Sequence, residues 1–240
     1  MKTVKLVPIL STLLTAALSA GAQPVLFQNL DFESANLSHP SGMYNEVPIA
    51  QALPSWHASI GGVPVSEVWT DGESAGDAAI NVLGPGWPYI YPGIISGNYT
   101  VLLQAGANPQ GGDTAVNVSI FQTGTIPADA QSLDFEAWNI EGGGPPSVSF
   151  DGNSLSPVAL SSGQSLSGQP YTLYGADISA YAGQMGQLRF TDVFGGPVMC
   201  GIELDDISFS PNAVPEPSTL ALLVTAGLAL AARRWRNKGT

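Results

Sequence analysis

Three aromatic side chains lie close together in the segment "GPGWPYIYPG". Trp87, Tyr89 and Tyr91 are spaced by two residues, with glycine and proline on both sides. In an extended chain, residues with this spacing project to the same side. Such flat aromatic surfaces stack on the C–H faces of sugar rings, and nearby acids or amides bind the hydroxyl groups. The segment therefore predicts a carbohydrate-binding platform; the alternative is that the rings cap one end of a hydrophobic core.

A serine in "GESAG" raises the question of nucleophilic catalysis. Residues Gly72 to Gly76 fit the G-x-S-x-G pattern, which needs a buried strand before the serine and a helix after it. The surrounding "VWTDGESAGDAA" is too polar and acidic for that context. The histidine partner in this kind of hydrolase follows the serine in the chain, whereas His39 and His57 both precede Ser74. We therefore interpret this stretch as a surface loop.

Other catalytic and metal-binding patterns are missing from the sequence. The single Cys200 excludes an internal disulfide and a cysteine metal cluster, and the two histidines lack metal-ligand spacing. There is no phosphate-binding P-loop, dinucleotide fingerprint or H-E-x-x-H zinc motif. The sequence leaves open a pair of carboxylates for glycoside hydrolysis, because the two partners can be distant in sequence. We expect a non-catalytic protein with no catalytic residues, and glycoside activity is the weaker alternative.

The charges are distributed unevenly along the 240 residues. All nineteen acidic residues lie between Asp31 and Glu216, whereas six of the seven basic residues lie outside that span. Residues 23–213 hold eighteen acids and one base, Arg189, for a net charge of −17. A segment this acidic repels nucleic acid and anionic lipid, so neither is an expected partner. It attracts divalent cations.

Residues 23–213 predict one β domain. Short runs of alternating apolar and polar residues recur between stretches rich in glycine, proline and serine, such as "EGGGPP" and "SSGQSLSGQP". No long helical period is present, and "AGDAAINVLG" suggests at most one or two helical turns. We expect an antiparallel β-sandwich of the jelly-roll type with eight to ten strands. The runs interpreted as strands are "PVLFQNLDF", "YTVLLQA", "AVNVSIFQT", "SLDFEAW", "PSVSFDG", "QLRFTDVF" and "GIELDDISF".

The first 22 residues have the pattern of a secretory signal peptide. Lys2 and Lys5 precede the apolar stretch "LVPILSTLLTAALSA", and small residues lead up to a cleavage site between Ala22 and Gln23. The alternative, a first core helix, fits less well with Pro8 and the small residues near Ala22. We expect cleavage by signal peptidase after export.

The last 27 residues (214–240) have three parts: a Pro-Glu-Pro triplet, a short apolar helix and a basic end. Thirteen apolar or small residues give about 20 Å of helix, less than the ~30 Å core of a bilayer. A transmembrane helix over 218–232 therefore needs Ser218 and Thr219. Cations at both chain ends would remain in the cytoplasm, which places the acidic body outside the inner membrane.

This arrangement resembles the PEP-CTERM sorting signal, through Pro215, Glu216 and Pro217 followed by the apolar helix and then Arg233 and Arg234. The resemblance implies recognition by exosortase, a membrane peptidase of Gram-negative bacteria that make exopolysaccharide. It further implies that the tail is removed near the triplet and that the body reaches the cell surface or the extracellular matrix. It says nothing about the chemistry of the body.

The body resembles a galactose-binding-like jelly roll, the scaffold of many carbohydrate-binding modules. The resemblance rests on "NLDFE" from Asn29 to Glu33, on "LPSWHAS", and on "IELDDISFS" from Ile202 to Ser210. It implies a structural calcium ion held by Glu33 with Asp205 or Asp206 and by backbone carbonyls. Calcium prefers six to eight oxygen ligands, which this acidic chain has in surplus. The alternative is that these acids are solvated at a sheet edge.

The alternation in "IELDDISF" predicts a β-bulge. Ile202 and Leu204 define one face of a strand, and Ile207 and Phe209 continue that face only if one of the two adjacent aspartates is an extra residue. From all of these features we expect an exported surface or matrix protein that binds or organises exopolysaccharide, as in a biofilm. The alternative is a purely structural matrix protein without a ligand site.

Overall fold

The computed structural model describes residues 25–38, 40, 45–70, 74, 76–86, 93–111, 114–140, 144–195 and 201–214. The expected signal peptide and its cleavage site at Ala22 and Gln23 lie outside the described residues, as do the sorting residues from Pro215 onward with the expected transmembrane helix 218–232. Across the described part of the chain, no helix combines the length and apolar character needed to cross a membrane.

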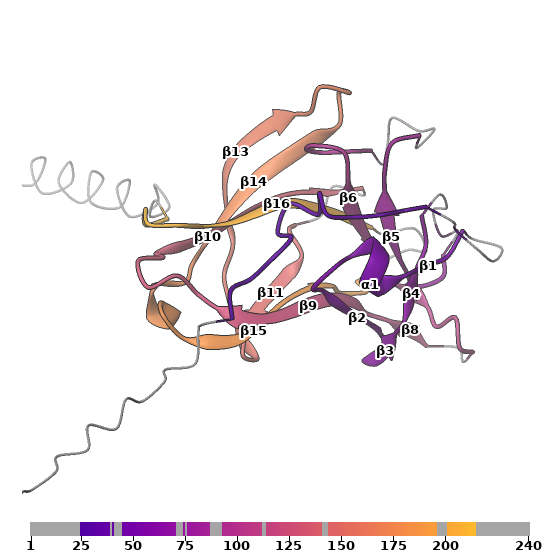
Figure 1. Cartoon of the computed structure of the whole chain (residues 1–240), viewed down its shortest axis with the longest axis horizontal. Helices are drawn as coiled ribbons and strands as arrows, with labels where there is room; N and C mark the ends of the chain where they lie inside the picture. The colour runs from indigo at the N-terminus through magenta and orange to yellow at the C-terminus, as the bar shows by residue number, and fades with distance from the viewer. Residues whose placement is uncertain are drawn as a thin grey trace, which may run out of the picture.

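Two six-stranded antiparallel sheets make up the body (Figure 1). The first sheet has the order β13-β14-β10-β16-β6-β5, and the second has the order β12-β11-β15-β9-β2-β3. The strands of the first sheet are β5 (Ala79–Leu83), β6 (Thr100–Gln104), β10 (Ser132–Asn139), β13 (Val158–Gln164), β14 (Pro170–Asp177) and β16 (Ile202–Ser210). The strands of the second sheet are β2 (His57–Ile60), β3 (Val63–Val65), β9 (Val118–Thr125), β11 (Ser147–Phe150), β12 (Asn153–Ser154) and β15 (Met185–Asp192).

Short elements complete the described fold. Strand β1 (Val47–Pro48) pairs with β4 (Glu67–Val68), and β7 (Gly106–Ala107) pairs with β8 (Ala115–Val116). The described helices are α1 (Ile49–Ala52) and a 3₁₀ turn, η1 (Ser179–Tyr181). The expected all-β, antiparallel character is therefore confirmed. The expected eight to ten strands are too few, because the two large sheets alone contain twelve.

Aromatic side chains from both sheets meet in a shared core. The ring of Phe135 on β10 lies edge-on to Phe190 on β15, with centroids 5.3 Å apart. Trp56 lies between Phe190 and Phe32, at centroid distances of 6.4 and 5.7 Å. All four side chains are buried. Full burial of a side chain such as Phe contributes roughly 1.5–3 kcal/mol, so this cluster holds the two sheets face to face as a sandwich.

The expected opening strand, "PVLFQNLDF", is wrong. Asn29 and Phe32 both have positive φ, at 49° and 57°, which is incompatible with a continuous strand. The segment instead turns and sends Phe32 into the core. The backbone carbonyl of Val25 accepts from Thr125 N–H of the second sheet, and that of Leu30 accepts from Ile207 N–H of the first. Residues 25–38 therefore tie the two sheets together instead of extending either one.

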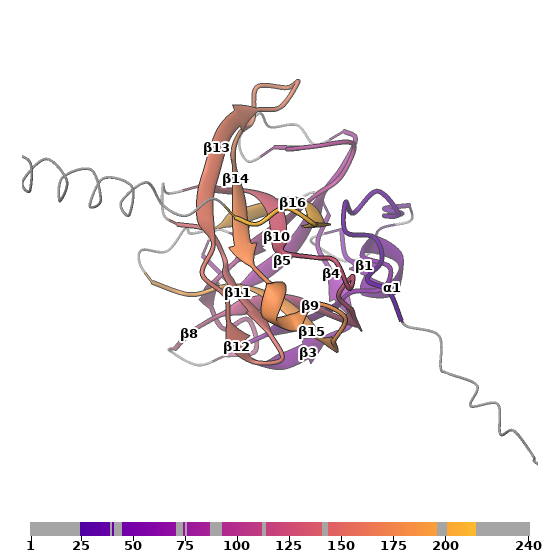
Figure 2. The ribbon, with the colours of Figure 1, turned by 90° about the vertical axis from the view of Figure 1, so that its left-hand side faces the viewer.

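Two other interpretations change in the first sheet. The stretch "AGDAAINVLG" contains strand β5 and no helix; all five residues of β5 are buried, so the polar alternation of a one-sided strand is missing. The stretch "SSGQSLSGQP" is not a simple connection, because Ser161–Gln164 belong to β13 and only residues 165–169 form the turn to β14. Figure 2 shows that the β13–β14 hairpin projects beyond the rest of the sandwich.

Candidate functional site

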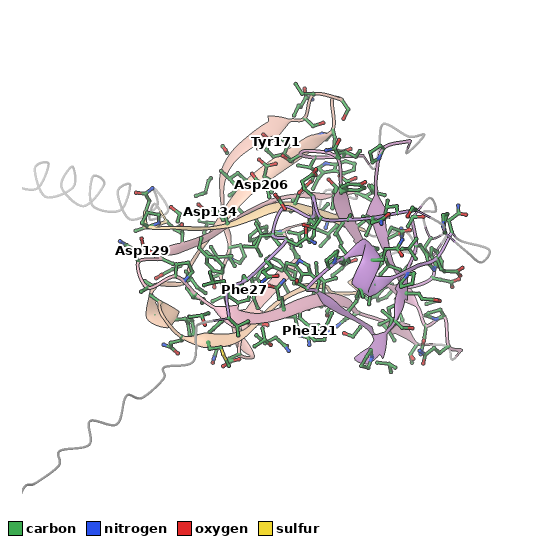
Figure 3. All side chains as sticks on the ribbon, viewed as in Figure 1. Phe27, Phe121, Asp129, Asp134, Tyr171 and Asp206 are labelled. Atoms are coloured by element: carbon green, nitrogen blue, oxygen red, sulfur yellow. The ribbon has the colours of Figure 1, made fainter. Side chains whose placement is uncertain are left out.

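Five carboxylates lie on two neighbouring central strands of the first sheet. On β10, Phe135 points into the core, so Asp134 and Glu136 face the opposite, outer side. On β16, Leu204 points into the core, so Glu203 and Asp205 face the outer side, and Asp206 is exposed next to them. Figure 3 shows Asp134, Asp206 and Tyr171 on this sheet.

The expected β-bulge in β16 is confirmed. Asp134 pairs with Ser208 and Glu136 pairs with Asp205, so one residue of β10 faces two residues of β16 at this point. Asp206 has a φ of 45°, in the left-handed region. The extra residue allows Leu204 and Ile207 to face the same core, as the sequence pattern requires.

Residues Gly93–Tyr99, here called the strap, lie across this outer face and are held by three carboxylates. Gly93 N–H donates to Glu203 Oε1 at 2.5 Å, and Ser96 N–H donates to Asp205 Oδ2 at 3.1 Å. The N–H groups of Asn98 and Tyr99 donate to Glu33 Oε1 at 2.7 and 3.0 Å. Carboxylates that accept backbone N–H groups form strong, charge-assisted hydrogen bonds.

The residues of the expected calcium site are brought together only in part. Glu33 and Asp205 bind the same strap, whereas Asp206 is exposed on the bulge. Within the described ranges, no three His, Cys, Asp or Glu residues form a group that could hold a metal ion. The oxygens of Glu33 and Asp205 already accept hydrogen bonds from the strap. Calcium at these residues stays a prediction.

Asp205 is completely buried beneath the strap. Burial raises the pKa of Asp205 to about 8, although hydrogen bonds from Thr100, from the N–H of Asp206 and from Ser96 act in the opposite direction. The charge of Asp206 raises the pKa of Asp205 further. The Thr100 hydroxyl donates to Asp205 Oδ2 at 2.5 Å and accepts from Ile95 N–H at 2.9 Å. Asp205 is therefore a structural group that positions the strap.

A cleft of about 460 Å³ opens between the strap and the β13–β14 hairpin. One wall comes from the strap, the floor includes an outward side chain of β10, and the other wall comes from the hairpin and its turn. The cleft is lined by Ile94, Ile95, Ser96, Gly97, Glu136, Gln164, Ser165, Leu166, Ser167 and Tyr171. It combines apolar surface, an aromatic ring, hydroxyl groups, an amide and a carboxylate, which is the composition of a small-ligand site.

Glu136 is the acidic group of this cleft. Burial raises the pKa of Glu136, the charge of Asp206 raises it further, and a hydrogen bond from Tyr171 opposes both. The neighbouring charge of Glu136 is in turn the largest cause that raises the pKa of Tyr171. A titratable group with a shifted pKa in a cleft is a candidate for ligand binding or proton transfer.

The backbone at Gly163 leaves room for the Tyr171 ring. A Cβ atom at Gly163 would lie 2.6 Å from Tyr171 Cζ, so the ring packs directly on the glycine across the β13–β14 pair. A larger residue at position 163 would push the ring away from its present place. The glycine thus fixes one side of the aromatic wall.

The sequence pattern did not identify Glu136 and Tyr171 as site residues. The alternation in "SLDFEAW" places Glu136 on the outer face, but nothing local links it to Tyr171, which directly follows the segment "SSGQSLSGQP" that was interpreted as a connection. The aromatic residues expected to bind sugar, Trp87, Tyr89 and Tyr91, lie outside the described residues. Their segment precedes the strap directly in sequence.

The remaining residues that could do chemistry have structural roles in the described fold. The Ser74 hydroxyl donates to the backbone carbonyl of Asp77, and Ser74 N–H donates to Gln104 Oε1 at 3.0 Å. His57 stacks on Phe121, with ring centroids 5.6 Å apart. Trp56 is a core residue whose indole N–H donates to the Asn29 carbonyl at 2.8 Å. His39 and Cys200 lie outside the described residues.

A second cleft, of about 350 Å³, lies where β3, β4 and β5 meet. Its lining includes the half-buried Trp69 together with Glu46, Glu67 and Gln110. It is smaller than the first cleft, and none of the residues with a shifted pKa lines it.

Residues 213–236 match the PEP-CTERM protein-sorting motif. This motif implies processing by exosortase and export, with sorting to the surface or to a membrane-associated location. No curated protein matches the chain. Among solved structures, the chain is similar to the crystal structure of an apo form cyclase from Fischerella sp., with 15% identity over 82% of this chain and 100% of that chain, at a TM-score of 0.40. A TM-score of this size does not establish a common fold, and the expected galactose-binding-like jelly roll is not confirmed.

Proposed function

We propose that this chain is an exosortase-sorted protein whose exported body binds exopolysaccharide at the cell surface or in the extracellular matrix, without catalysis. The sorting motif supports the destination. The observation that carries the binding role is the cleft between the strap and the β13–β14 hairpin. Among the described residues, this cleft is the best candidate for a sugar-binding site.

The lining of the cleft matches what a sugar offers to a protein. A pyranose ring has apolar C–H faces and an equator of hydroxyl groups. The Tyr171 ring and the side chains of Ile94 and Leu166 provide apolar contact, while Gln164 and Glu136 provide hydrogen-bonding groups. The aromatic residues Trp87, Tyr89 and Tyr91 lie outside the described residues, and their contribution to sugar binding stays a prediction from the sequence.

The test is retention of the full-length protein, purified in mild detergent, on exopolysaccharide from its host. The substitution Tyr171→Ala should weaken retention at least about tenfold, which corresponds to a loss of about 1.4 kcal/mol in binding. The matched control is Phe121→Ala, an aromatic truncation on the outer face of the second sheet, which should retain wild-type binding. If a folded Tyr171→Ala protein is retained as well as wild type, the cleft is not the sugar-binding site. The alternative of a purely structural matrix protein would then remain.

One observation favours a second candidate, a glycoside-active enzyme. Glu136 has a raised pKa, and the carboxylate of Asp206 is close enough to contribute to that shift. Glycoside hydrolysis uses a pair of carboxyl groups, one of which acts as an acid with a raised pKa. Release of reducing ends from the bound polysaccharide, abolished by Glu136→Gln, would replace binding with catalysis as the function. If no reducing ends are released at saturating protein concentration, the non-catalytic proposal stands.

The route to the surface forms part of the proposal. Signal peptidase would cut between Ala22 and Gln23, and exosortase would cut near Pro215–Pro217 after the tail has held the chain in the inner membrane of a Gram-negative cell. The mass of the protein recovered from its host reports both cuts. An intact 24.8 kDa chain in the cytoplasm would contradict the route.

A further inference from the structure

The cleft contains an acidic group that no lysine or arginine of the described residues balances. Glu136 lines the cleft, and the charge of Asp206 disfavours the ionised form of Glu136. Among the residues that the structure describes, Arg189 is the single lysine or arginine, and it lies on β15 of the second sheet. Its guanidinium carbon is 4.1 Å from the centroid of the Phe121 ring. A cation that binds beside Glu136 would offset the repulsion from Asp206.

Two buried hydrogen-bond acceptors near the cleft have no donor in the described part of the chain, but neither belongs to a residue of its lining. Gln169 is completely buried in the turn whose Ser165 and Leu166 line the cleft, and its Oε1 accepts no hydrogen bond from the described part of the chain. Asp134 Oδ1, on the same face of β10 as Glu136, is also buried without a donor. The acceptors that a ligand in the cleft can reach are those of the lining, among them the Glu136 carboxylate and the Gln164 amide oxygen. An ammonium group supplies three donors and no acceptor.

A metal ion is the other cation that carboxylates bind, but this cleft suits an organic amine better. Calcium requires six to eight oxygen ligands, whereas Glu136 is the one carboxylate in the lining of the cleft. The described residues bring no three metal-binding side chains together. An ammonium group needs only two or three acceptors, and the Tyr171 ring offers a face for a cation and for the carbon skeleton that carries it.

We infer that the cleft selects glycans that carry a protonated amine, such as a polymer of a deacetylated amino sugar. This inference rests on the proposed function and specifies its ligand. The ammonium group binds beside Glu136, with Asp206 contributing long-range attraction. The sugar ring lies against Tyr171 and Leu166.

The test compares three trisaccharides of equal length, built from glucosamine, from N-acetylglucosamine and from glucose. Each is titrated by calorimetry at pH 6 into the full-length protein in mild detergent. The glucosamine trimer should bind at least about tenfold more tightly than the other two. Glu136→Gln should reduce this preference to twofold or less, because it removes the charge and retains the shape. Asp129→Asn, the same change of charge at an exposed turn away from the cleft, should retain the preference.

The outcomes separate this inference from the proposed function. Equal binding of the three trimers, weakened by Tyr171→Ala, would overturn the amine selectivity and retain glycan binding. A preference that survives Glu136→Gln would also overturn it. No binding of any trimer, with no retention on the host polysaccharide, would overturn both. Calcium binding that depends on Glu136, without an amine preference, would assign the cleft to a metal ion and overturn the inference.

Discussion

The outer faces of the two sheets accommodate charge in different ways. On the second sheet, Arg189 lies over the ring of Phe121 and donates to Gln187 Oε1 and Ser59 Oγ, and His57 stacks on the same ring. These partners come from adjacent strands of that sheet. On the first sheet, the carboxylates bind N–H groups of the strap, and Glu136 faces the cleft.

This difference indicates which of the two outer faces is the better candidate for ligand binding. The outer face of the second sheet has one charged residue in its described strands, Arg189, and binds it with side chains that are already fixed by strand pairing. The outer face of the first sheet concentrates acidic residues. Their hydrogen-bond donors come from the strap, which is not part of the sheet, and Glu136 faces the cleft. A face whose charged groups are not all paired within its own sheet is the better candidate for a ligand.

The largest effect is expected for Asp205→Ala. The substitution leaves the Ser96 N–H and the Thr100 hydroxyl without their buried acceptor. Each unsatisfied buried group costs about 1–3 kcal/mol, so the free energy of unfolding should fall by about 2–6 kcal/mol in urea denaturation at pH 6. A loss below 0.5 kcal/mol would show that the strap does not depend on this carboxyl group.

The pH dependence of the stability of Asp205→Asn tests the raised pKa of this buried carboxyl group. The pKa of Asp205 is about 8 in the fold, above its ordinary 3.8, so the folded state binds the extra proton between those values. The stability that wild type gains from this proton is complete below pH 4 and is lost as the pH rises through 8. Asp205→Asn does not titrate, so its stability relative to wild type should increase from pH 5 to pH 9. The exposed control Asp129→Asn should show no such trend; a flat difference for Asp205→Asn would contradict the raised pKa.

A smaller effect distinguishes two glycines with positive φ, one in the strap over the first sheet and one in a turn of the second sheet. Gly97 in the strap has a φ of 56°, and a Cβ there would lie 2.3 Å from Glu33 Oε1. Gly62, between β2 and β3, has a φ of 80°, and a Cβ there would have no atom within 4 Å. Both alanine substitutions are strained, by roughly 1 kcal/mol, but Gly97→Ala should lose about 1–2 kcal/mol more because Glu33 must move. Equal thermal stability of the two variants would contradict the anchoring of the strap by Glu33.

On the second sheet, Arg189→Met should lower the free energy of unfolding by about 1 kcal/mol. The substitution removes the interaction with the Phe121 ring, which is worth roughly 0.5–1 kcal/mol, and the hydrogen bonds to Gln187 and Ser59. Thr123→Ala, an exposed change on β9, is the control and should stay within about 0.5 kcal/mol of wild type. A loss as large as that of Asp205→Ala would remove the contrast between the faces.

The smallest effect on stability is expected for Tyr171→Phe, which removes one hydroxyl group at the cleft. Its hydrogen bond to Glu136 lowers the pKa of that carboxyl group, so its loss should raise the pKa of Glu136 further, with a change in stability below about 0.5 kcal/mol. A carbon NMR titration of the Glu136 side chain measures the shift. Tyr174→Phe, on the same strand but stacked on Phe135, is the control. An unchanged or lower pKa in Tyr171→Phe would contradict the contact.

The parts of the fold that were predictable from sequence are those with one buried and one solvent-exposed face. Strand β10 and the bulge of β16 follow from alternation, because one extra aspartate is needed to keep Leu204 and Ile207 on the same side. Strand β5 could not be identified this way, because both of its faces are covered and its residues do not alternate in polarity.

The candidate site was less predictable because it is assembled across the sheet order. Glu136, Tyr171 and the strap are distant in sequence and meet only because β14, β10, β16 and β6 are neighbours in the first sheet. No local pattern encodes that order. Glu33 was identified by its motif, but its observed role is to accept N–H groups of the strap at Asn98 and Tyr99.

The most direct test of the binding account is a map of amide chemical-shift changes on addition of the glucosamine trimer. If the first sheet holds the ligand, the changes should concentrate at Ile94–Gly97, at Ser165–Ser167 and around Tyr171, with none at His57, Phe121 or Arg189. Changes centred on the outer face of the second sheet, or saturation of binding without changes at the strap and hairpin, would contradict the assignment of this cleft.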